Sequence, residues 1–210
     1  ARDGTVWLGV GGSLMTFRGK RTSILELPGE ARDARIFCLA ETADGDILIG
    51  TDGSGLFRAH GNDIAPLAGF PSDTASTVRA LLAAPGGEVI IGTRSGAYRW
   101  KDGRCDFIPL GDGPESISTL AHGTDGTIWF GTFGQGLYGL RADGSLREYD
   151  QANGLLEYGV RALLVDARGR LWIGSKFGVN TLDGDRLRSY TIHQGLPNDN
   201  IWCLFQDRDG

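Results

Sequence analysis

A short phrase recurs along the whole chain and limits what the chain can fold into. Its clearest copy, residues 125–132, reads Asp-Gly-Thr-Ile-Trp-Phe-Gly-Thr: a tight turn, an apolar run and a glycine. The turn glycine recurs at positions 4, 45, 87, 126, 169 and 210. A fixed period of roughly forty residues is typical of a propeller or another repeat array, because each unit is too small to bury its own apolar face.

One repeat contains four short apolar runs bounded by turn residues. In the best-defined unit they span 116–121, 127–132, 137–141 and 146–150, and we call them strands A, B, C and D of the repeat. The dipeptide Asp-Gly separates strand A from B and strand C from D. This dipeptide is a strong hairpin signal, because a type I′ turn needs positive φ at both central residues. Four antiparallel strands in each period make one propeller blade.

The predicted fold is all-β: one β-propeller domain over residues 1–210, with five repeats of four-stranded antiparallel blades. Residues 1–33 supply strands B, C and D of one blade, and the last strand A, 200–205, has no strand B of its own. We expect these two ends to pair and close the ring, since closure removes exposed strand edges. The alternative is an arc of a seven-bladed propeller. The repeat boundaries lie near Gly4, Gly45, Gly87, Gly126, Gly169 and Gly210.

Two columns of the repeat predict how neighbouring blades pack. A large apolar residue stands in each strand B, and a glycine follows it two positions later. The pairs are Trp7 and Gly9, Leu48 and Gly50, Ile90 and Gly92, Trp129 and Gly131, and Trp172 and Gly174. We interpret the large residues as blade-to-blade packing in preference to an aromatic cage for a ligand. The glycines are expected to allow a close backbone approach or a tight bend.

Composition argues against several classes of protein. The formal net charge is −5 and charges of both signs are mixed, which disfavours a nucleic-acid or anionic-membrane surface. No apolar run approaches the ~20 residues of a membrane helix, and no signal peptide is visible after Ala1. Three cysteines give no disulfide framework. No nucleophile elbow, metal-ligand pair or phosphate loop is present, so we expect a non-catalytic protein with no metal site and no cofactor.

The loops predict which face of the protein binds a partner. Strand direction alternates within a blade, so the short A–B and C–D turns share one face, and the B–C turns and long D–A loops share the other. Binding residues concentrate on variable loops held by a rigid scaffold, so we expect the site on the second face. Two columns at the start of strand A supply its candidate ligand-binding residues: Arg35, Phe37, Arg79, Arg161, Asn200 and Trp202. The arginines suit a carboxylate or phosphate, and the aromatic rings suit a sugar or another ring.

Two segments resemble the repeat of the two-component regulator propellers. Residues 166–179 read Asp-Ala-Arg-Gly-Arg-Leu-Trp-Ile-Gly-Ser-Lys-Phe-Gly-Val, and residues 190–201 contain Gly-Leu-Pro-Asn-Asp-Asn. The family's Gly-Leu-Pro-x-Asn element is matched closely at 195–200 and loosely at 154–156. The likeness covers the whole chain as repeats and is strong from about residue 116 onward. The Gly-His and Trp-Asp signature of WD40 propellers is absent.

The resemblance implies a function as well as a fold. In this family the propeller is usually the sensory region of a bacterial membrane-bound histidine kinase or diguanylate cyclase. It usually lies on the periplasmic or extracellular side and often responds to a saccharide or another small ligand. We therefore expect a ligand sensor whose partner is a small polar molecule, attached to a membrane only through segments absent from this chain. Rings in this family more often have seven blades, so the five repeats of this chain depart from the family pattern.

Two other function classes stay open at this point. One is a protein-interaction scaffold, in which the propeller also mediates a homodimer. The other is a propeller lyase of the streptogramin B lyase type, which needs a general base and usually a metal at the channel mouth. His122 and His193 are the candidates for that chemistry, and they are not the paired set such a site requires.

Overall fold

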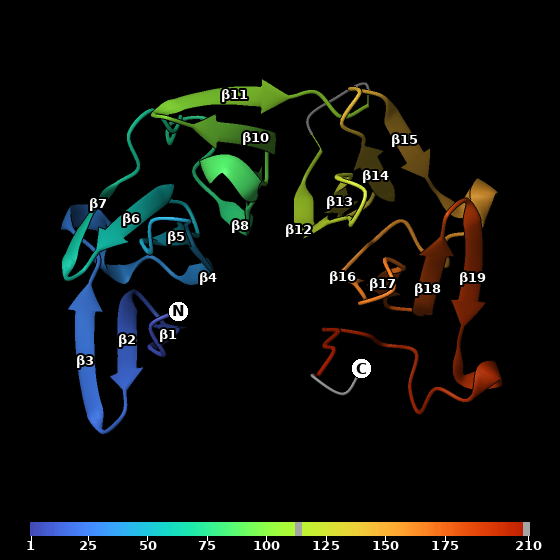
Figure 1. Ribbon diagram of the computed structural model, residues 1–210, viewed down its shortest axis with the longest axis horizontal. Helices are drawn as coiled ribbons and strands as arrows, with labels where there is room; N and C mark the ends of the chain where they lie inside the picture. The colour runs from blue at the N-terminus through green and yellow to red at the C-terminus, as the bar shows by residue number, and fades with distance from the viewer. Residues whose placement is uncertain (112–114, 208–210) are drawn as a thin grey trace. The chain divides into compact units, whose positions relative to one another are not determined.

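The computed structural model describes residues 1–111 and 115–207, which form two compact units, Ala1–Pro109 and Leu110–Gly210. In both units the chain folds into antiparallel sheets whose strands follow one another in sequence order, as Figure 1 shows. Each unit is described by itself below. The predictions of a single domain and of a closed ring stay predictions, and the repeat boundary at Gly210 lies outside the described residues.

The first unit contains three sheets. The first has three strands in the order β1-β2-β3, and the other two have four each, in the orders β4-β5-β6-β7 and β8-β9-β10-β11. The strands are β1 (Val6–Val10), β2 (Ser13–Arg18), β3 (Arg21–Glu26), β4 (Ile36–Glu41), β5 (Ile47–Thr51), β6 (Leu56–His60), β7 (Asp63–Pro66), β8 (Val78–Ala83), β9 (Val89–Thr93), β10 (Gly96–Lys101) and β11 (Arg104–Ile108).

The second unit contains two four-stranded sheets, β12-β13-β14-β15 and β16-β17-β18-β19. Their strands are β12 (Ile117–His122), β13 (Ile128–Thr132), β14 (Leu137–Leu140), β15 (Leu146–Tyr149), β16 (Ala162–Val165), β17 (Leu171–Ser175), β18 (Gly178–Asp183) and β19 (Arg186–Tyr190). The described helices are single 3₁₀ turns, η1 (Gly29–Asp33), η2 (Pro85–Gly87), η3 (Gln151–Asn153) and η4 (Ile192–Gln194). No helix in the described part of the chain is long and apolar enough to cross a membrane.

The predicted four-strand repeat is confirmed in four of the five sheets. In the sheet formed by β12 to β15, each strand begins and ends within about one residue of the sequence prediction. The prediction of a strand over 200–205 is wrong, because this segment is not a strand in the structure. Every strand A that forms in the described residues pairs with the strand B that follows it. Among the described residues no strand pairs with the segment 200–205, so it joins no ladder.

Apolar side chains pack between neighbouring sheets, as the large-residue column predicts. In the first unit one cluster joins Leu14 of the first sheet to Ile47 and Ile49 of the second, with Trp7 packed against it. In the second unit Trp129 packs against a cluster that includes Leu171 and Ile173 of the last sheet, among other residues. The interpretation of this column as blade-to-blade packing is therefore confirmed at both tryptophans.

The glycine column explains how neighbouring sheets come so close. A Cβ atom on the glycine of strand B would lie less than 3 Å from an apolar side chain at the start of the next strand A. The distances are 2.7 Å for Gly9 to Ile36, 2.8 Å for Gly50 to Val78, 2.6 Å for Gly131 to Val160 and 2.7 Å for Gly174 to Ile201. Real Cβ atoms do not approach this closely, so glycine is required for contact and not for a bend.

Candidate functional site

Strand A is interrupted by a one-residue bulge near its start. The ladder runs from Ile36 to Cys38, from Val78 to Ala80 and from Ile117 to Thr119, and skips the residue between them. In the last sheet Arg161 precedes the ladder and its N–H donates to the Gly174 carbonyl at 2.8 Å. Bulges commonly re-aim a side chain at functional sites. The residues in this bulge column are Phe37, Arg79, Ser118 and Arg161, with Trp202 at the equivalent sequence position.

In the second unit the bulge column brings three predicted site residues together. The Arg161 guanidinium lies over the Trp202 ring, 4.4 Å from the ring centre. Its Nη1 donates a hydrogen bond to Asn200 Oδ1 at 2.5 Å. Arg161 is half-buried, and Trp202 is 70% exposed. Cation–π stacking and a hydrogen bond thus hold one guanidinium beside an open aromatic ring.

The first unit repeats this arrangement with different residues. The Arg79 guanidinium lies 5.1 Å from the centre of the Phe37 ring, and both side chains are half-buried. Arg35, the remaining predicted site residue, is exposed, and its carbonyl accepts the Asp52 N–H at 2.8 Å. The structure therefore pairs Arg79 with Phe37, while the only described contact of Arg35 is through its backbone.

The long D–A loops and the B–C turns share a face, as the sequence predicts. Gly136, in a B–C turn, donates its N–H to Tyr158 of the next D–A loop at 2.8 Å. Lys176, in the following B–C turn, donates its N–H to Glu157 Oε2 at 3.0 Å. The 3₁₀ turns η3 and η4 within these loops were missed. Their capping boxes, Asp150 with Asn153 and Thr191 with Gln194, are a sequence signal that could have found them.

Asn180 of β18 anchors the D–A loop that precedes the Arg161 strand. Its side chain is 1% exposed. Its Oδ1 accepts the Leu156 N–H at 2.9 Å, and its Nδ2 donates to the Gly154 carbonyl at 3.1 Å and to Ser189 Oγ at 2.9 Å. A buried amide with three partners fixes the loop to the sheet.

Replacing Asn180 by alanine should therefore loosen this loop. We expect the free energy of unfolding to fall by about 1–3 kcal/mol, because buried loop groups lose their partners. Hydrogen exchange should show faster exchange of the Leu156 amide. Asn62→Ala, at an exposed turn of the other unit, is the control and should change neither quantity. Unchanged protection of Leu156 in the Asn180 variant would contradict the anchoring role.

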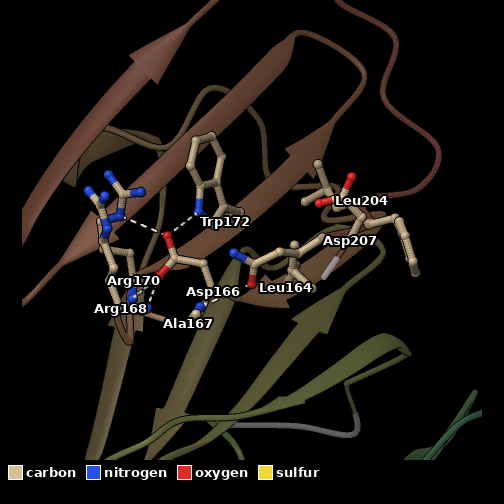
Figure 2. Close-up of a pocket in the computed structure, with 10 residues that line it drawn as sticks. Leu164, Asp166, Ala167, Arg168, Arg170, Trp172, Leu204 and Asp207 are labelled. Atoms are coloured by element: carbon tan, nitrogen blue, oxygen red, sulfur yellow. Dashed lines mark hydrogen bonds and ion pairs between the residues drawn. The ribbon is translucent and has the colours of Figure 1, made fainter. Parts of the chain in front are cut away.

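The opposite face, at the A–B turns, carries structural polar networks. In the second unit a cleft of about 710 Å³ lies between the last sheet and residues 204–207, and Figure 2 shows Asp166 at its wall. Asp166 accepts hydrogen bonds from Trp172 Nε1 at 2.9 Å and Arg170 Nε at 2.8 Å. Burial raises the pKa of Asp166, but the hydrogen bonds outweigh it and lower the pKa to about 2.

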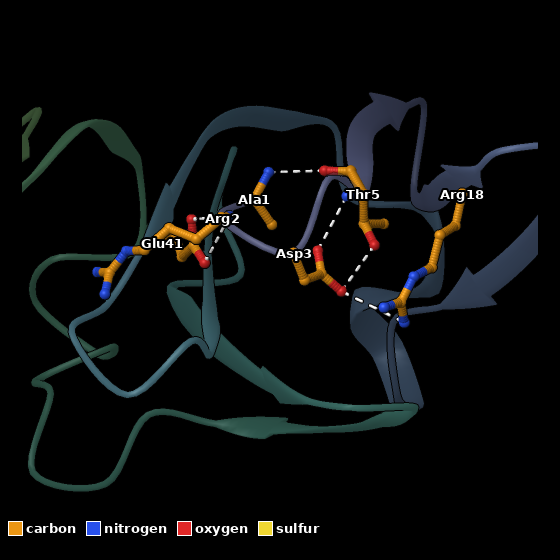
Figure 3. Close-up of polar contacts among 6 residues, drawn as sticks. All are labelled: Ala1, Arg2, Asp3, Thr5, Arg18 and Glu41. Carbon is orange, nitrogen blue, oxygen red and sulfur yellow. Dashed lines mark hydrogen bonds and ion pairs between the residues drawn. The ribbon is translucent and has the colours of Figure 1, made fainter.

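The last residue of strand A fastens neighbouring repeats together on this same face. In Figure 3 both carboxylate oxygens of Glu41 accept the Arg2 backbone N–H, at 3.0 and 2.9 Å. Gln206 accepts the Ala167 N–H at 3.0 Å in the equivalent way. His122 ends β12 at the same position of the repeat. The column therefore has a structural role in two of its members, and no three metal-ligating side chains gather anywhere in the described ranges.

A family comparison bears on the strand that carries Arg161. Residues 154–177 match the family model described as two component regulator propeller. The chain carries a two-component regulator propeller repeat. The matched repeat includes the D–A loop that Asn180 anchors, strands β16 and β17, and the B–C turn after them. No curated protein sequence matches the chain.

Solved structures show the same fold at low sequence identity. The extracellular domain of a hybrid two component system from B. thetaiotaomicron has a TM-score of 0.83 and 18% identity, covering 99% of this chain and 29% of that one. Virginiamycin B lyase from Staphylococcus aureus has a TM-score of 0.81 and 16% identity, covering 97% and 71%. The calcium-binding protein regucalcin from Agrobacterium tumefaciens has a TM-score of 0.67 and 20% identity, covering 96% and 74%. The fold is that of a β-propeller with four-stranded antiparallel blades, which confirms the predicted fold class.

Proposed function

We propose that this chain is a non-catalytic, ligand-sensing propeller from a bacterial receptor, placed on the periplasmic or extracellular side of the membrane. Its ligand is a small polar molecule, with a saccharide as the leading candidate, bound on the face of the B–C turns and D–A loops. The propeller repeat of the two-component regulator family supports the signalling role. The likeness to an extracellular two-component domain supports the location, although this chain spans only 29% of that protein.

One observation carries the binding proposal: a guanidinium lies on an aromatic ring in the bulge column of each unit. Arg79 lies over Phe37 in the first unit, and Arg161 lies over Trp202 in the second. Sites for polar small molecules usually combine an aromatic or apolar surface with a few hydrogen-bond donors in fixed positions. The rings offer a face on which a sugar ring can stack, and the arginines offer hydrogen bonds to its polar edge.

The double variant Arg79→Ala, Arg161→Ala tests the guanidinium–ring pair of each unit at once. A thermal-shift screen of mono- and oligosaccharides on the unaltered chain supplies the ligand, and calorimetric titration then compares affinities. We expect at least a tenfold loss of affinity, since each lost charge-assisted hydrogen bond is worth about 1.5–3 kcal/mol. Arg104→Ala with Arg186→Ala, at exposed positions of β11 and β19, is the matched control. Equal affinity in the Arg79→Ala, Arg161→Ala variant and the control would show that neither arginine contributes to ligand binding.

Fold likeness also supports a second candidate, a propeller lyase. Virginiamycin B lyase covers 97% of this chain in structure, at 16% identity. In this chain His193 lies exposed in η4, and His122 lies half-buried at the end of β12. A metal assay on the unaltered chain and on His193→Ala separates the two functions. Stoichiometric metal that the substitution removes would favour the lyase.

A further inference from the structure

Arg161 differs from four other half-buried arginines in what balances its charge. Each of those four pairs with a carboxylate: Arg58 with Asp46, Arg99 with Glu88, Arg147 with Asp185, and Arg170 with Asp166. Within the described residues Arg161 has no carboxylate in ion-pair range, and its contacts are the Asn200 amide and the Trp202 ring. Glu157, on the adjoining loop, accepts the Lys176 N–H instead. A half-buried cation held by neutral groups keeps its affinity for an external anion.

The neighbours of Arg161 also fix the orientation of its guanidinium plane. The guanidinium carbon lies 4.4 Å over the centre of the Trp202 ring, and the hydrogen bond to Asn200 orients the guanidinium above that ring. Asn200 is itself held, because its N–H donates to Asn198 Oδ1 at 2.8 Å. The contact with Asn200 uses one of the five N–H donors of the guanidinium. A planar fork fixed in this way matches the two oxygens of a carboxylate, which lie in one plane.

We propose that Arg161 binds a carboxylate group of the ligand, with Asn200 and Trp202 as positioning residues. This inference rests on the proposed function and narrows its ligand to an organic acid, either a free carboxylic acid or an acidic sugar. The anion enters from solvent, since the Trp202 ring is 70% exposed. The bound carboxylate is the counter-ion that is absent from the described protein contacts of Arg161. Binding involves no covalent step.

Acetate is the simplest probe of this site. It is titrated into the full chain at constant ionic strength, with chloride as the replaced anion. Nuclear magnetic resonance follows the Arg161 Nε–H and Trp202 Nε1–H signals. The Trp202 signal is identified by its loss in Trp202→Phe. We expect saturable shifts with a Kd of roughly 1–100 mM, the range for one bidentate charge-assisted contact. Arg161→Lys keeps the charge but loses the fork, and saturation should disappear. Arg188→Lys, at an exposed position of β19, is the control and should leave the titration unchanged.

Asn200 is tested by two substitutions with different expected effects. Asn200→Ala removes the orienting hydrogen bond and should weaken acetate binding at least threefold. Asn200→Asp places a carboxylate beside Arg161 and should abolish the acetate response while the rest of the spectrum keeps its native dispersion. A residue with only a structural role would not show this second effect. Equal acetate affinity in Asn200→Asp and the unaltered chain would overturn the proposal.

Two further comparisons complete the test. One distinguishes an acidic sugar from a free carboxylic acid, and the other distinguishes failure of the carboxylate inference from failure of the sensing function. D-Glucuronate binding much more tightly than acetate, with D-glucose not binding, indicates an acidic sugar; equal affinity for acetate and glucuronate indicates a free acid. Shifts no larger than those from chloride would overturn the carboxylate inference. If a neutral saccharide then moves the same resonances, the sensing function stands without it. If acetate saturates but no member of the saccharide screen binds, the anion site stands and the saccharide-sensing proposal fails.

Discussion

Replacing Asp166 by alanine is expected to lower the free energy of unfolding by about 2–3 kcal/mol, because hydrogen bonds to a charged group are each worth about 1.5–3 kcal/mol. The carboxylate is 5% exposed and accepts hydrogen bonds from the side chains of Trp172 and Arg170 and from the backbone of the same turn. The alanine variant leaves the half-buried side-chain donors of Trp172 and Arg170 without this acceptor. Urea unfolding at neutral pH measures the effect. Asp185→Ala, which removes a largely exposed partner of Arg147, is the control and should change stability by less than about 1 kcal/mol.

The same carboxylate predicts how stability depends on pH. The folded-state pKa of Asp166 is lowered from 3.8 to about 2. A group with a depressed pKa contributes its full stability above its unfolded pKa, and this contribution is lost as pH falls through the folded pKa. We therefore expect about 2 kcal/mol of stability to disappear between about pH 4 and pH 2. Asp166→Asn cannot titrate and should lack this part of the acid slope. Parallel curves for the unaltered chain and this variant would contradict the assignment.

The regular part of the fold could be predicted because its signals are local. Asp-Gly turns need positive φ at the glycine, and Gly45 and Gly126 adopt it, at 86° and 85°. Alternating apolar runs between such turns define strands within about one residue in the sheet of β12 to β15. The third repeat has Gly86-Gly87 in place of Asp-Gly, and it still makes the turn, with both glycines at positive φ. Turn chemistry and strand period are each contained in a few consecutive residues.

The bulge and the stacked pairs could not be predicted in the same way. Phe37, Arg79 and Ser118 share a bulge but no residue type, so no local signal marks it. In the first unit the residue before each bulge, Ile36 or Val78, packs against the glycine of the neighbouring sheet, which is a tertiary contact. The candidate columns could be identified from their position in the strand. The contact of Arg161 with Trp202 could not, because it joins two different repeats. The segment 200–205 has a strand-like sequence but forms no strand, because no strand among the described residues pairs with it.

Gly131→Val tests the close packing of neighbouring sheets beside Arg161 and is expected to lower the free energy of unfolding by about 3 kcal/mol. A Cβ atom at Gly131 would lie 2.6 Å from both Thr119 Cγ2 and Val160 Cγ1. Val160 is 1% exposed, so its side chain has no room to move away without shifting the backbone that carries it. A loss of this size in a chain of this length should lower Tm by about 6–12 °C. Thermal unfolding followed by circular dichroism measures the change.

Gly134→Val is the matched control, three residues further along in the B–C turn. A Cβ atom there meets nothing within 4 Å, and the residue is exposed, so its stability should change by less than about 0.5 kcal/mol. The two variants also separate packing from binding, because Val160 directly precedes Arg161. Gly131→Val should disturb the Arg161 and Trp202 resonances even where the chain stays folded, whereas Gly134→Val should leave them unchanged. Similar stability in the two variants would mean that the glycine column does not set the spacing of the sheets.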